Sequence, residues 1–494
     1  MNALRDRVVR TPFLLTLAMM LALAIRLPHL AGRSFTLDEI SSVVIAGSDW
    51  STFWLIVTKF EANMALYYGA LRAWMLLGDS EPIVRFLSVI PAVATIPVVY
   101  AIDARWLGVR AGLVAALLLA LNGLHASWSQ MARGYTLAVL LATLSAYHFQ
   151  RGIEEPRARH WTVYVVTGVL AVYAHFFAGL VLLSQWVSLG LLRRQAVPWR
   201  RVATSIAAII VGVTPLLMFV ATQDVGQIDW QEEPSLQRIL GAFNFLAGGN
   251  GSRAPLVLYG ATLIATAMAV VRLWRSAWGS LAAWRHGLLV LWLALPIALA
   301  LGVSIAKPVF SIRYLTLCIP PLAVLAAVGI ERIRSRAFLA AALVIFGVAA
   351  FPSVLTPPDL RTTEWERATA YVLRRAAPGD GLFFYVPKGR LAFDHYRRRI
   401  TSQAAEPAVV FPPRWQWEYL VTERMLTPQP EILSSLSQRY DRIWLVLAHD
   451  WVRVTGRDLV SRSIQSDLAT QFPVTESRPF RGVRVILYQQ YAKE

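Results

Sequence analysis

The sequence predicts a polytopic membrane protein with an all-α core and a smaller soluble α/β domain at its C-terminal end. Two properties of the 494-residue chain support a membrane assignment: 56% of its residues are hydrophobic and only 16% are charged. Soluble globular domains carry about 25% charged residues. The third observation is a change of pattern near residue 356, where long apolar runs give way to short segments separated by polar residues.

Apolar runs long enough to approach the ~20 residues of a membrane-spanning helix recur along the core. We expect about eleven transmembrane helices, at residues 11–29, 84–104, 111–128, 135–150, 161–178, 179–192, 203–221, 254–271, 287–305, 314–330 and 337–354. We interpret the first run as a retained signal-anchor helix. The segment 63–77 is shorter and contains Arg72, so we expect a re-entrant or interfacial helix there. If it spanned instead, the topology after it would be inverted.

The distribution of basic residues indicates the orientation. With the N-terminus in the cytoplasm and 63–77 not spanning, eighteen arginines from Arg5 to Arg336 fall in inside loops. Seven basic residues fall outside: Arg33, Lys59, Arg133, Arg238, Arg253, Lys307 and Arg313. This asymmetry follows the positive-inside rule and predicts an extracytoplasmic C-terminus. Anionic membrane lipids are sufficient partners for the net charge of +18, so no nucleic-acid partner is predicted.

Two domains follow from this pattern. Residues 1–355 form the predicted membrane core, whose first extracytoplasmic loop spans about 30–62, and residues 356–494 form the predicted extracytoplasmic domain. The boundary lies in the Pro-rich stretch Thr356-Pro357-Pro358-Asp359. In the second domain we expect a helix ending near Arg375 and strands at 381–386, 443–447 and 483–488.

Two adjacent carboxylates, Asp38 and Glu39, follow the first predicted span. Carboxylates at a membrane surface are costly to keep without a use, and a carboxylate is suited to general-base chemistry. The alternative is a solvated loop or a helix N-terminus. We take Asp38 as the candidate base and Glu39 as a supporting group. Glu61, in the same loop, is the next candidate.

Basic side chains at predicted outside helix ends are suited to binding a phosphate. A guanidinium group is planar, permanently charged and able to bind two oxygens, which favours Arg133 and Arg313, with Lys307 beside the latter. The alternative is that each anchors the chain at the membrane interface. His125 and His175 lie near outside ends of predicted spans and are candidates for lining a cavity, although either can also be a buried hydrogen-bonding partner.

Several motifs in a fixed order carry a family resemblance. They are Val84-Arg85-Phe86, Trp106-Leu107-Gly108-Val109-Arg110-Ala111-Gly112, Ser129-Gln130-Met131-Ala132-Arg133-Gly134-Tyr135, Tyr173-Ala174-His175-Phe176-Phe177 and Lys307-Pro308-Val309-Phe310-Ser311-Ile312-Arg313-Tyr314. With them, most of residues 1–400 resembles GT-C glycosyltransferases. The nearest resemblance is to the bacterial, dolichyl-phosphate-mannose protein mannosyltransferase-like branch (glycosyltransferase family 39 type), which includes lipid A aminoarabinose transferases.

This resemblance implies a hexosyl- or pentosyltransferase of the bacterial cell envelope, in the cytoplasmic (inner) membrane. It implies a polyprenyl-phosphate-sugar donor, an extracytoplasmic active site and inversion at the anomeric carbon. The acceptor stays open among a protein, a glycolipid and a polysaccharide. The resemblance carries the base role onto Asp38, and it places Arg133 and Tyr135 in one cavity. Tyr67 falls in the segment that corresponds to the cavity entrance in relatives.

Met131 and Cys318 bear on whether the protein holds a metal. Relatives often have an acid where this chain has Met131, and the single cysteine, Cys318, permits no Cys-based metal site. A divalent metal therefore stays open as an alternative that the sequence does not support, and no cofactor is predicted.

A transporter or flippase for lipid-linked glycans, and a glycan polymerase or ligase, are the alternative functions. A transporter is expected to show charges near helix centres and paired half-repeats. A polymerase or ligase is expected to have a large outside loop rich in Arg and His.

Overall fold

The computed structural model describes residues 2–222, 234–249, 252–333, 335–355, 363–400, 406–420, 430–448 and 457–491. Contacts divide the chain into two compact units. The first, here the membrane unit, comprises residues 1–31, 62–223 and 233–358, and the second, here the sheet unit, comprises 32–61, 224–232 and 359–494. The segment 32–61 after the first apolar run thus groups with the C-terminal part of the chain. The predicted boundary at 356–359 lies outside the described residues.

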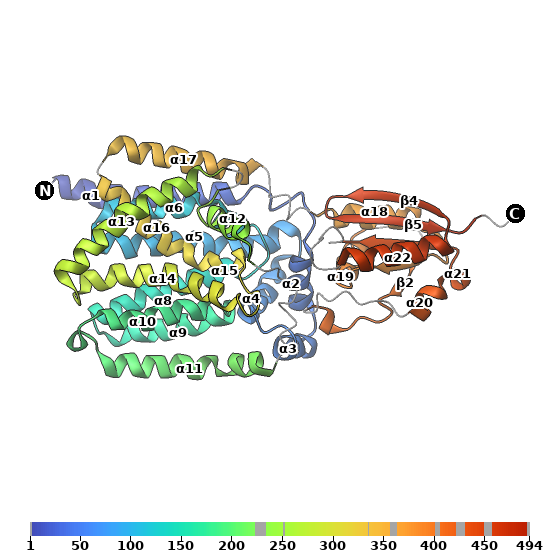
Figure 1. Ribbon diagram of the computed structural model, residues 1–494, viewed down its shortest axis with the longest axis horizontal. Helices are drawn as coiled ribbons and strands as arrows, with labels where there is room; N and C mark the ends of the chain where they lie inside the picture. Colours follow the sequence, from blue (N-terminus) through green and yellow to red (C-terminus); the bar gives the residue numbers. More distant parts are fainter. Residues whose placement is uncertain are drawn as a thin grey trace. The chain divides into compact units, whose positions relative to one another are not determined.

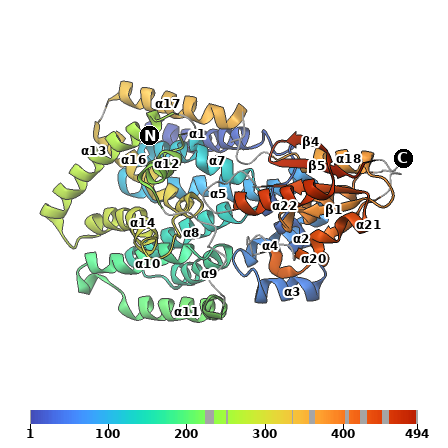
Figure 2. The ribbon, with the colours of Figure 1, turned by 45° about the vertical axis from the view of Figure 1, so that its right-hand side comes forward.

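The membrane unit is helical, and every predicted apolar run contains helix. Its long helices lie side by side: α5 packs against α6 and α8, and α14 packs against α10 and α16 (Figures 1 and 2). The α-helices are α1 (Asn2–Arg26), α4 (Ala65–Trp74), α5 (Glu81–Leu107), α6 (Val109–Leu121), α7 (Gly123–Ser129), α8 (Tyr135–Glu154), α9 (Ala158–Ala174), α10 (Ala178–Ser188), α11 (Trp199–Thr222), α12 (Leu236–Leu246), α13 (Ala254–Ala277), α14 (Leu281–Val303), α15 (Ile312–Leu315), α16 (Ile319–Ile333) and α17 (Arg336–Leu355). Short 3₁₀ helices are η1 (Met75–Leu77), η2 (Leu189–Leu191), η3 (Arg194–Ala196) and η5 (Thr316–Cys318).

Fewer helices are long and apolar enough to count as membrane spans than the sequence predicts. Among the described residues, five qualify: α5, α11, α13, α14 and the stretch Ile312–Arg332. The pair α6 and α7 is bent by 57° and would add a sixth. Shorter apolar helices lie at Thr11–Arg26, Ala178–Leu191 and Ala337–Val348. The helical membrane core is therefore confirmed, whereas the number of about eleven spans stays a prediction.

The segment 63–77 forms the short helix α4 followed by η1. At 1.5 Å per residue the ten residues of α4 extend about 15 Å, which is half of the ~30 Å hydrocarbon core. A helix of this length does not cross a bilayer by itself. Its placement at the membrane interface stays a prediction.

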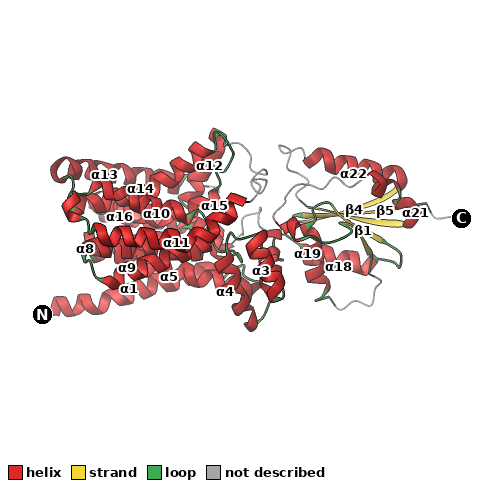
Figure 3. Ribbon diagram, turned by 90° about the horizontal axis from the view of Figure 1, so that it is seen from below, coloured by secondary structure: helices red, strands yellow, loops and turns green. Residues whose placement is uncertain are grey.

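The sheet unit contains the predicted α/β domain. Its five strands are β1 (Gly381–Phe384), β2 (Ala408–Phe411), β3 (Arg442–Leu447), β4 (Val474–Phe480) and β5 (Val483–Gln489), in the order β2-β1-β3-β5-β4. The first three strands are parallel, and β5 pairs antiparallel with β3 and β4. Helix α22 (Arg457–Gln471) covers one face, whereas α18 (Trp365–Arg375) and α19 (Lys388–Arg397) cover the other (Figure 3). The remaining elements are α2 (Leu37–Gly47), α3 (Trp50–Lys59), η7 (Trp417–Leu420), α20 (Pro430–Ser434) and α21 (Leu436–Arg439).

The three predicted strands correspond to β1, β3 and β5, which are the central strands. The predictions missed β2 and β4, which form the two edges. Strand β2 has only four residues, and β4 is exposed along most of its length with the sequence VTESRPF. The sequence of β4 lacks the apolar pattern of a buried strand, whereas β2 is an apolar run (AVVF) at the minimum length by which such a strand is recognised.

Candidate active site

The carboxylate pair lies in the first turn of α2. Thr36 is the N-cap residue: its hydroxyl oxygen accepts from the Glu39 backbone N–H at 3.3 Å, and the Glu39 carboxylate accepts from the Thr36 N–H at 2.9 Å. This reciprocal arrangement is a capping box, which satisfies two backbone donors at a helix start. Both acidic side chains are also favoured there by the partial positive charge of the helix N-terminus.

The two carboxylates have different environments. Glu39 is fully buried and holds the start of α2 through the capping box. Asp38 is partly exposed, and its backbone oxygen accepts from the Ser42 hydroxyl within the helix. Asp38 is therefore the more exposed member of the pair. Glu61 lies in the same unit just after α3, where its N–H bonds to the Ile56 carbonyl oxygen.

In the membrane unit, Arg133 occupies the turn between α7 and α8. Its guanidinium donates to the Tyr68 hydroxyl at 3.4 Å and lies 6.0 Å from the centre of the Tyr135 ring. Gly134 permits this close packing, because a Cβ there would lie 3.0 Å from the Ala174 carbonyl oxygen and 3.1 Å from the Tyr67 Cβ. The turn is thus wedged against α4 and the end of α9.

A chain of hydroxyl groups fixes the backbone of this turn. Ser88 in α5 donates to the Arg133 carbonyl oxygen at 3.1 Å, so the Tyr67 hydroxyl, 2.9 Å from Ser88 Oγ, is the donor in their mutual bond. Thr136 donates to the Ser88 carbonyl oxygen at 2.7 Å. Buried hydroxyls that are all paired hold their elements in one arrangement. Three separate elements therefore position Arg133.

An aromatic cluster continues from Tyr135 to α15. The His175 ring lies 5.5 Å from the Tyr135 ring and 5.5 Å from the Tyr314 ring, and Tyr314 stacks on Phe177 at 3.8 Å. His175 follows α9 directly, and it lies within electrostatic range of both Arg133 and Arg313. The structure therefore gathers Tyr67, Arg133, Tyr135, His175 and Arg313 around one place in the membrane unit.

Lys307 lies in the turn between α14 and α15. Within this turn the Ser304 hydroxyl oxygen accepts from the N–H groups of Val309 and Phe310, at 3.0 and 2.8 Å. The turn leads into the helical residues that carry Arg313 and Tyr314. Lys307 is partly buried, and its predicted role at the donor phosphate stays a prediction.

His125 has a different environment from His175. The fully buried Arg26 donates to His125 Nδ1 at 3.0 Å and to the Ala120 carbonyl oxygen at 2.9 Å. An arginine has donors only, so the imidazole proton is on Nε2. Arg26 thereby places positive charge at the C-terminal end of α6, where the chain bends at Asn122 and the helix leaves carbonyl groups unpaired.

Gln130 ties the same region to the end of α1. Its side-chain amide donates to the carbonyl oxygens of Ile25, Arg26 and Pro28, the last at 2.8 Å. Asn122 caps α7 by accepting from the His125 N–H at 2.9 Å. These contacts give the Ser129-Gln130 motif a structural role: they set the direction in which α7 delivers Arg133.

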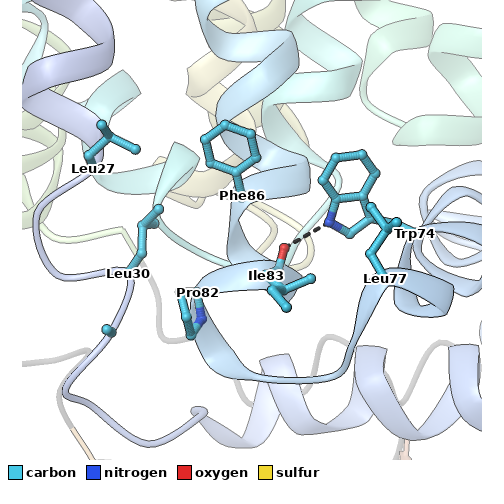
Figure 4. Close-up of a pocket in the computed structure, with 8 residues that line it drawn as sticks. Leu27, Leu30, Trp74, Leu77, Pro82, Ile83 and Phe86 are labelled. Carbon is cyan, nitrogen blue, oxygen red and sulfur yellow. Dashed lines mark hydrogen bonds between the residues drawn. The ribbon is translucent and has the colours of Figure 1, made fainter.

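An apolar groove lies near this cluster on the same helices. It has a volume of about 450 Å³ and is lined by Leu27, Leu30, Ala31, Trp74, Leu77, Pro82, Ile83 and Phe86 (Figure 4). Trp74 donates from its indole to the Ile83 carbonyl oxygen at 2.8 Å and stacks on Phe86. Helix α4 carries Tyr68 at the cluster and Trp74 at the groove, about 9 Å apart along the helix.

In the part of the chain that the structure describes, no group of three or more His, Cys, Asp or Glu side chains is arranged to hold a metal ion. The cluster in the membrane unit consists of arginine, tyrosine and histidine side chains, which suit an anion rather than a cation.

Several residues of the cluster had no assigned role in the sequence analysis. Tyr314 and Phe177 belong to motifs that carry the family resemblance, and Tyr68 follows Tyr67. The sequence nevertheless indicated no role for these three residues. Ser88 and Arg26 lie outside these motifs. A buried arginine in the first apolar run is costly unless its donors are satisfied, and this cost could have marked Arg26.

Comparison with known structures shows which proteins share this fold. The fold is similar to that of ArnT from Cupriavidus metallidurans, with 14% identity and 98% of both chains covered; the TM-score is 0.59 for the apo state and 0.56 for the structure bound to undecaprenyl phosphate. It is also similar to the archaeal oligosaccharyltransferase AglB from Archaeoglobus fulgidus in complex with an inhibitory peptide and a dolichol-phosphate. That TM-score is 0.51, with 11% identity over 89% of this chain and 69% of the other.

Part of the chain matches a known family. Residues 64–223 match the family described as dolichyl-phosphate-mannose-protein mannosyltransferase. No curated protein matches the chain. Residues 64–223 thus resemble this family, the fold of the whole chain is similar to that of ArnT, and at least five described helices are long and apolar enough to cross a membrane.

Proposed function

We propose that this protein transfers a sugar from a polyprenyl-phosphate donor to an extracytoplasmic acceptor, with inversion at the anomeric carbon. The observation that carries the proposal is the cluster in which His175 lies between the Tyr135 and Tyr314 rings, within electrostatic range of Arg133 and Arg313. Two guanidinium groups near one another suit a lipid phosphate, because each is permanently charged and can bind two oxygens. The lipid phosphates in the ArnT and AglB structures support the same class of donor.

The proposed step forms one bond and breaks one. The acceptor oxygen bonds to the anomeric carbon while the bond from that carbon to the phosphate oxygen breaks. Asp38 takes the acceptor proton, and polyprenyl phosphate leaves with the bonding electrons. Arg133 and Arg313 stabilise the charge that develops on the leaving phosphate. Glu39 supports Asp38 by holding the first turn of α2.

The apolar groove is the proposed site for the first part of the lipid chain. A volume of about 450 Å³ is within the range of small-molecule sites, and its lining is apolar. Burial of each methylene contributes about 0.8 kcal/mol, so even a short stretch of isoprenoid chain adds affinity. Helices α4 and α5 connect the groove to the residues proposed for the phosphate.

We expect Ala31→Trp, which places a large side chain at the groove, to raise the KM for a long-chain donor about tenfold. Displacing about two methylenes costs ~1.6 kcal/mol, which corresponds to that factor. The KM for a donor whose lipid is truncated to a short soluble chain should not change. The matched control is Ala158→Trp, at an exposed alanine at the start of α9. An equal rise for both donors would exclude the groove as the lipid site.

The proposed topology puts the N-terminus in the cytoplasm and residues 359–494 outside it, in the bacterial inner membrane. A reporter that is active only in the cytoplasm should be silent when fused after Glu494. The same reporter inserted beside Arg200 and Arg201, in a predicted inside loop, should be active. A strong signal from the C-terminal fusion would contradict the orientation.

The direct test of function is transfer by the purified protein. It should be incubated with defined polyprenyl-phosphate sugars and candidate acceptors, with and without a chelator of divalent cations, and the products followed by mass spectrometry. We expect loss of sugar from the lipid and its appearance on an acceptor or on water. A donor lipid that stays intact, in reactions where each donor and acceptor class is present, would contradict the proposal.

A further inference from the structure

The segment that precedes Asp38 is bound by the C-terminal part of the sheet unit. The backbone N–H of Phe35 donates to the Tyr396 hydroxyl oxygen at 2.6 Å, and the Phe35 carbonyl oxygen accepts from the Thr363 hydroxyl at 3.1 Å. The Phe35 ring is fully buried and meets the His395 ring edge-on at 5.5 Å. Both backbone groups of the residue three positions before Asp38 are therefore held by side chains more than 300 positions away.

The binding is reciprocal, because the same segment completes a helix of the C-terminal part. Helix α18 has Glu364 as its N-cap residue, but the Glu364 side chain makes no capping hydrogen bond. The N–H of Glu366, one of the first donors of the helix, donates instead to the Ser34 hydroxyl oxygen at 3.1 Å. A helix leaves its first four N–H groups without partners inside the helix, and Ser34 supplies one acceptor from the first loop.

Helix α2 itself packs against α19, which carries Tyr396. The face of α2 is apolar and buried at Leu37, Ile40 and Val43. Three kinds of contact thus fix the start of α2. They are the packing against α19, the capping box, and the hydrogen bonds that Phe35 makes with Tyr396 and Thr363. Each of these constraints acts within the first turn or directly before it, where Asp38 lies.

We propose that the C-terminal domain is the positioning element for the catalytic base, and that Tyr396 is its central positioning residue. This inference rests on the proposed function, since it assigns Tyr396 to act through Asp38. A general base works only when it lies within hydrogen-bond reach of the proton it takes, so a small displacement of the first turn of α2 lowers the rate. The domain thereby contributes to turnover without touching the substrate.

The first test measures the order of the segment without reference to chemistry. Tyr396→Phe removes the acceptor of the Phe35 N–H and leaves the ring in place. We expect hydrogen exchange in the peptide covering residues 34–42 to become about tenfold faster in the full-length protein, as befits loss of a buried hydrogen-bond partner. The matched control is Tyr488→Phe, which deletes the hydroxyl of another buried tyrosine in β5. Unchanged exchange in Tyr396→Phe would overturn the inference.

The second test asks whether Tyr396 acts through Asp38. In the wild-type background Tyr396→Phe should lower kcat about tenfold and leave the KM for the donor unchanged, whereas Tyr488→Phe should alter neither. In an Asp38→Asn background, Tyr396→Phe should cause no further loss, because residues that act as one unit are not additive. A further tenfold loss in that background, or an unchanged kcat in the wild-type background, would overturn the positioning role. Full activity of Asp38→Asn alone would instead contradict the proposed function.

Discussion

Asp38→Asn is expected to lower the rate of sugar transfer by about 10²–10⁴-fold, the usual contribution of a general base. Asparagine keeps the size of the side chain and much of its hydrogen bonding, but it has no basic oxygen. The capping box of Thr36 and Glu39 does not involve the Asp38 side chain, so α2 should form normally. The donor should therefore bind with its usual KM while turnover falls. Single-turnover transfer, measured with saturating donor, gives the rate of the chemical step.

Glu39→Gln is the matched control for this prediction. Glutamine can also serve in a capping box, so the start of α2 should survive with a small loss of activity. Glu39→Ala should cost about 1 kcal/mol of local stability, because it leaves the Thr36 N–H without its acceptor. If Asp38→Asn is active while Glu39→Gln is inactive, the two roles are reversed. If both are active, the base is elsewhere, and Glu61 is the next residue to test.

Arg133→Ala and Arg313→Ala are each expected to weaken donor binding by about 10–100-fold. A hydrogen bond to a charged group contributes about 1.5–3 kcal/mol, which corresponds to this range. Lysine at either position should restore only part of the affinity, because an ammonium group cannot make the planar contact with two oxygens. The measurement is donor affinity by titration, with the amount of folded protein checked by size-exclusion chromatography.

Arg238→Ala provides the comparison for the two arginines. Arg238 is exposed near the start of α12 and is also predicted to lie outside the membrane. If general positive charge attracts the donor, all three variants should weaken binding equally. If the cluster binds the phosphate, only Arg133 and Arg313 should matter. Normal affinity in both of those alanine variants would remove them from the phosphate site.

Local sequence pattern was enough to predict the helical core and the central strands. A segment in lipid must satisfy its backbone groups internally, so a run of about twenty apolar residues has few alternatives to a helix. The edge strands β2 and β4 escaped detection because one is short and the other is mostly exposed. Most of the motifs that carried the resemblance lie within residues 64–223, which match the family model, and the fold is similar to that of ArnT.

The role of Glu39 was within reach of the sequence. Thr36-Leu37-Asp38-Glu39 has a threonine followed three positions later by a glutamate, which is the pattern of a capping box. A helix N-terminus is one of the alternatives that the sequence leaves open for this pair. The structure shows that the helix start and a partly exposed Asp38 occur together, so the two alternatives do not exclude each other.

The sequence by itself determined which segments are helices, which strands are buried, and which charged residues stand at helix ends. Only the tertiary structure decided which of these residues meet. Arg26 contacts His125 from 99 positions away, and Phe35 contacts Tyr396 from 361 positions away. The physical reason is that periodicity and capping act within a few residues, whereas hydrogen bonds and packing between elements depend on how the chain folds back. The fold places His175 in the cluster with Arg133 and Arg313, and it places His125 at the end of α6. It also places the segment before Asp38 against the C-terminal part of the sheet unit.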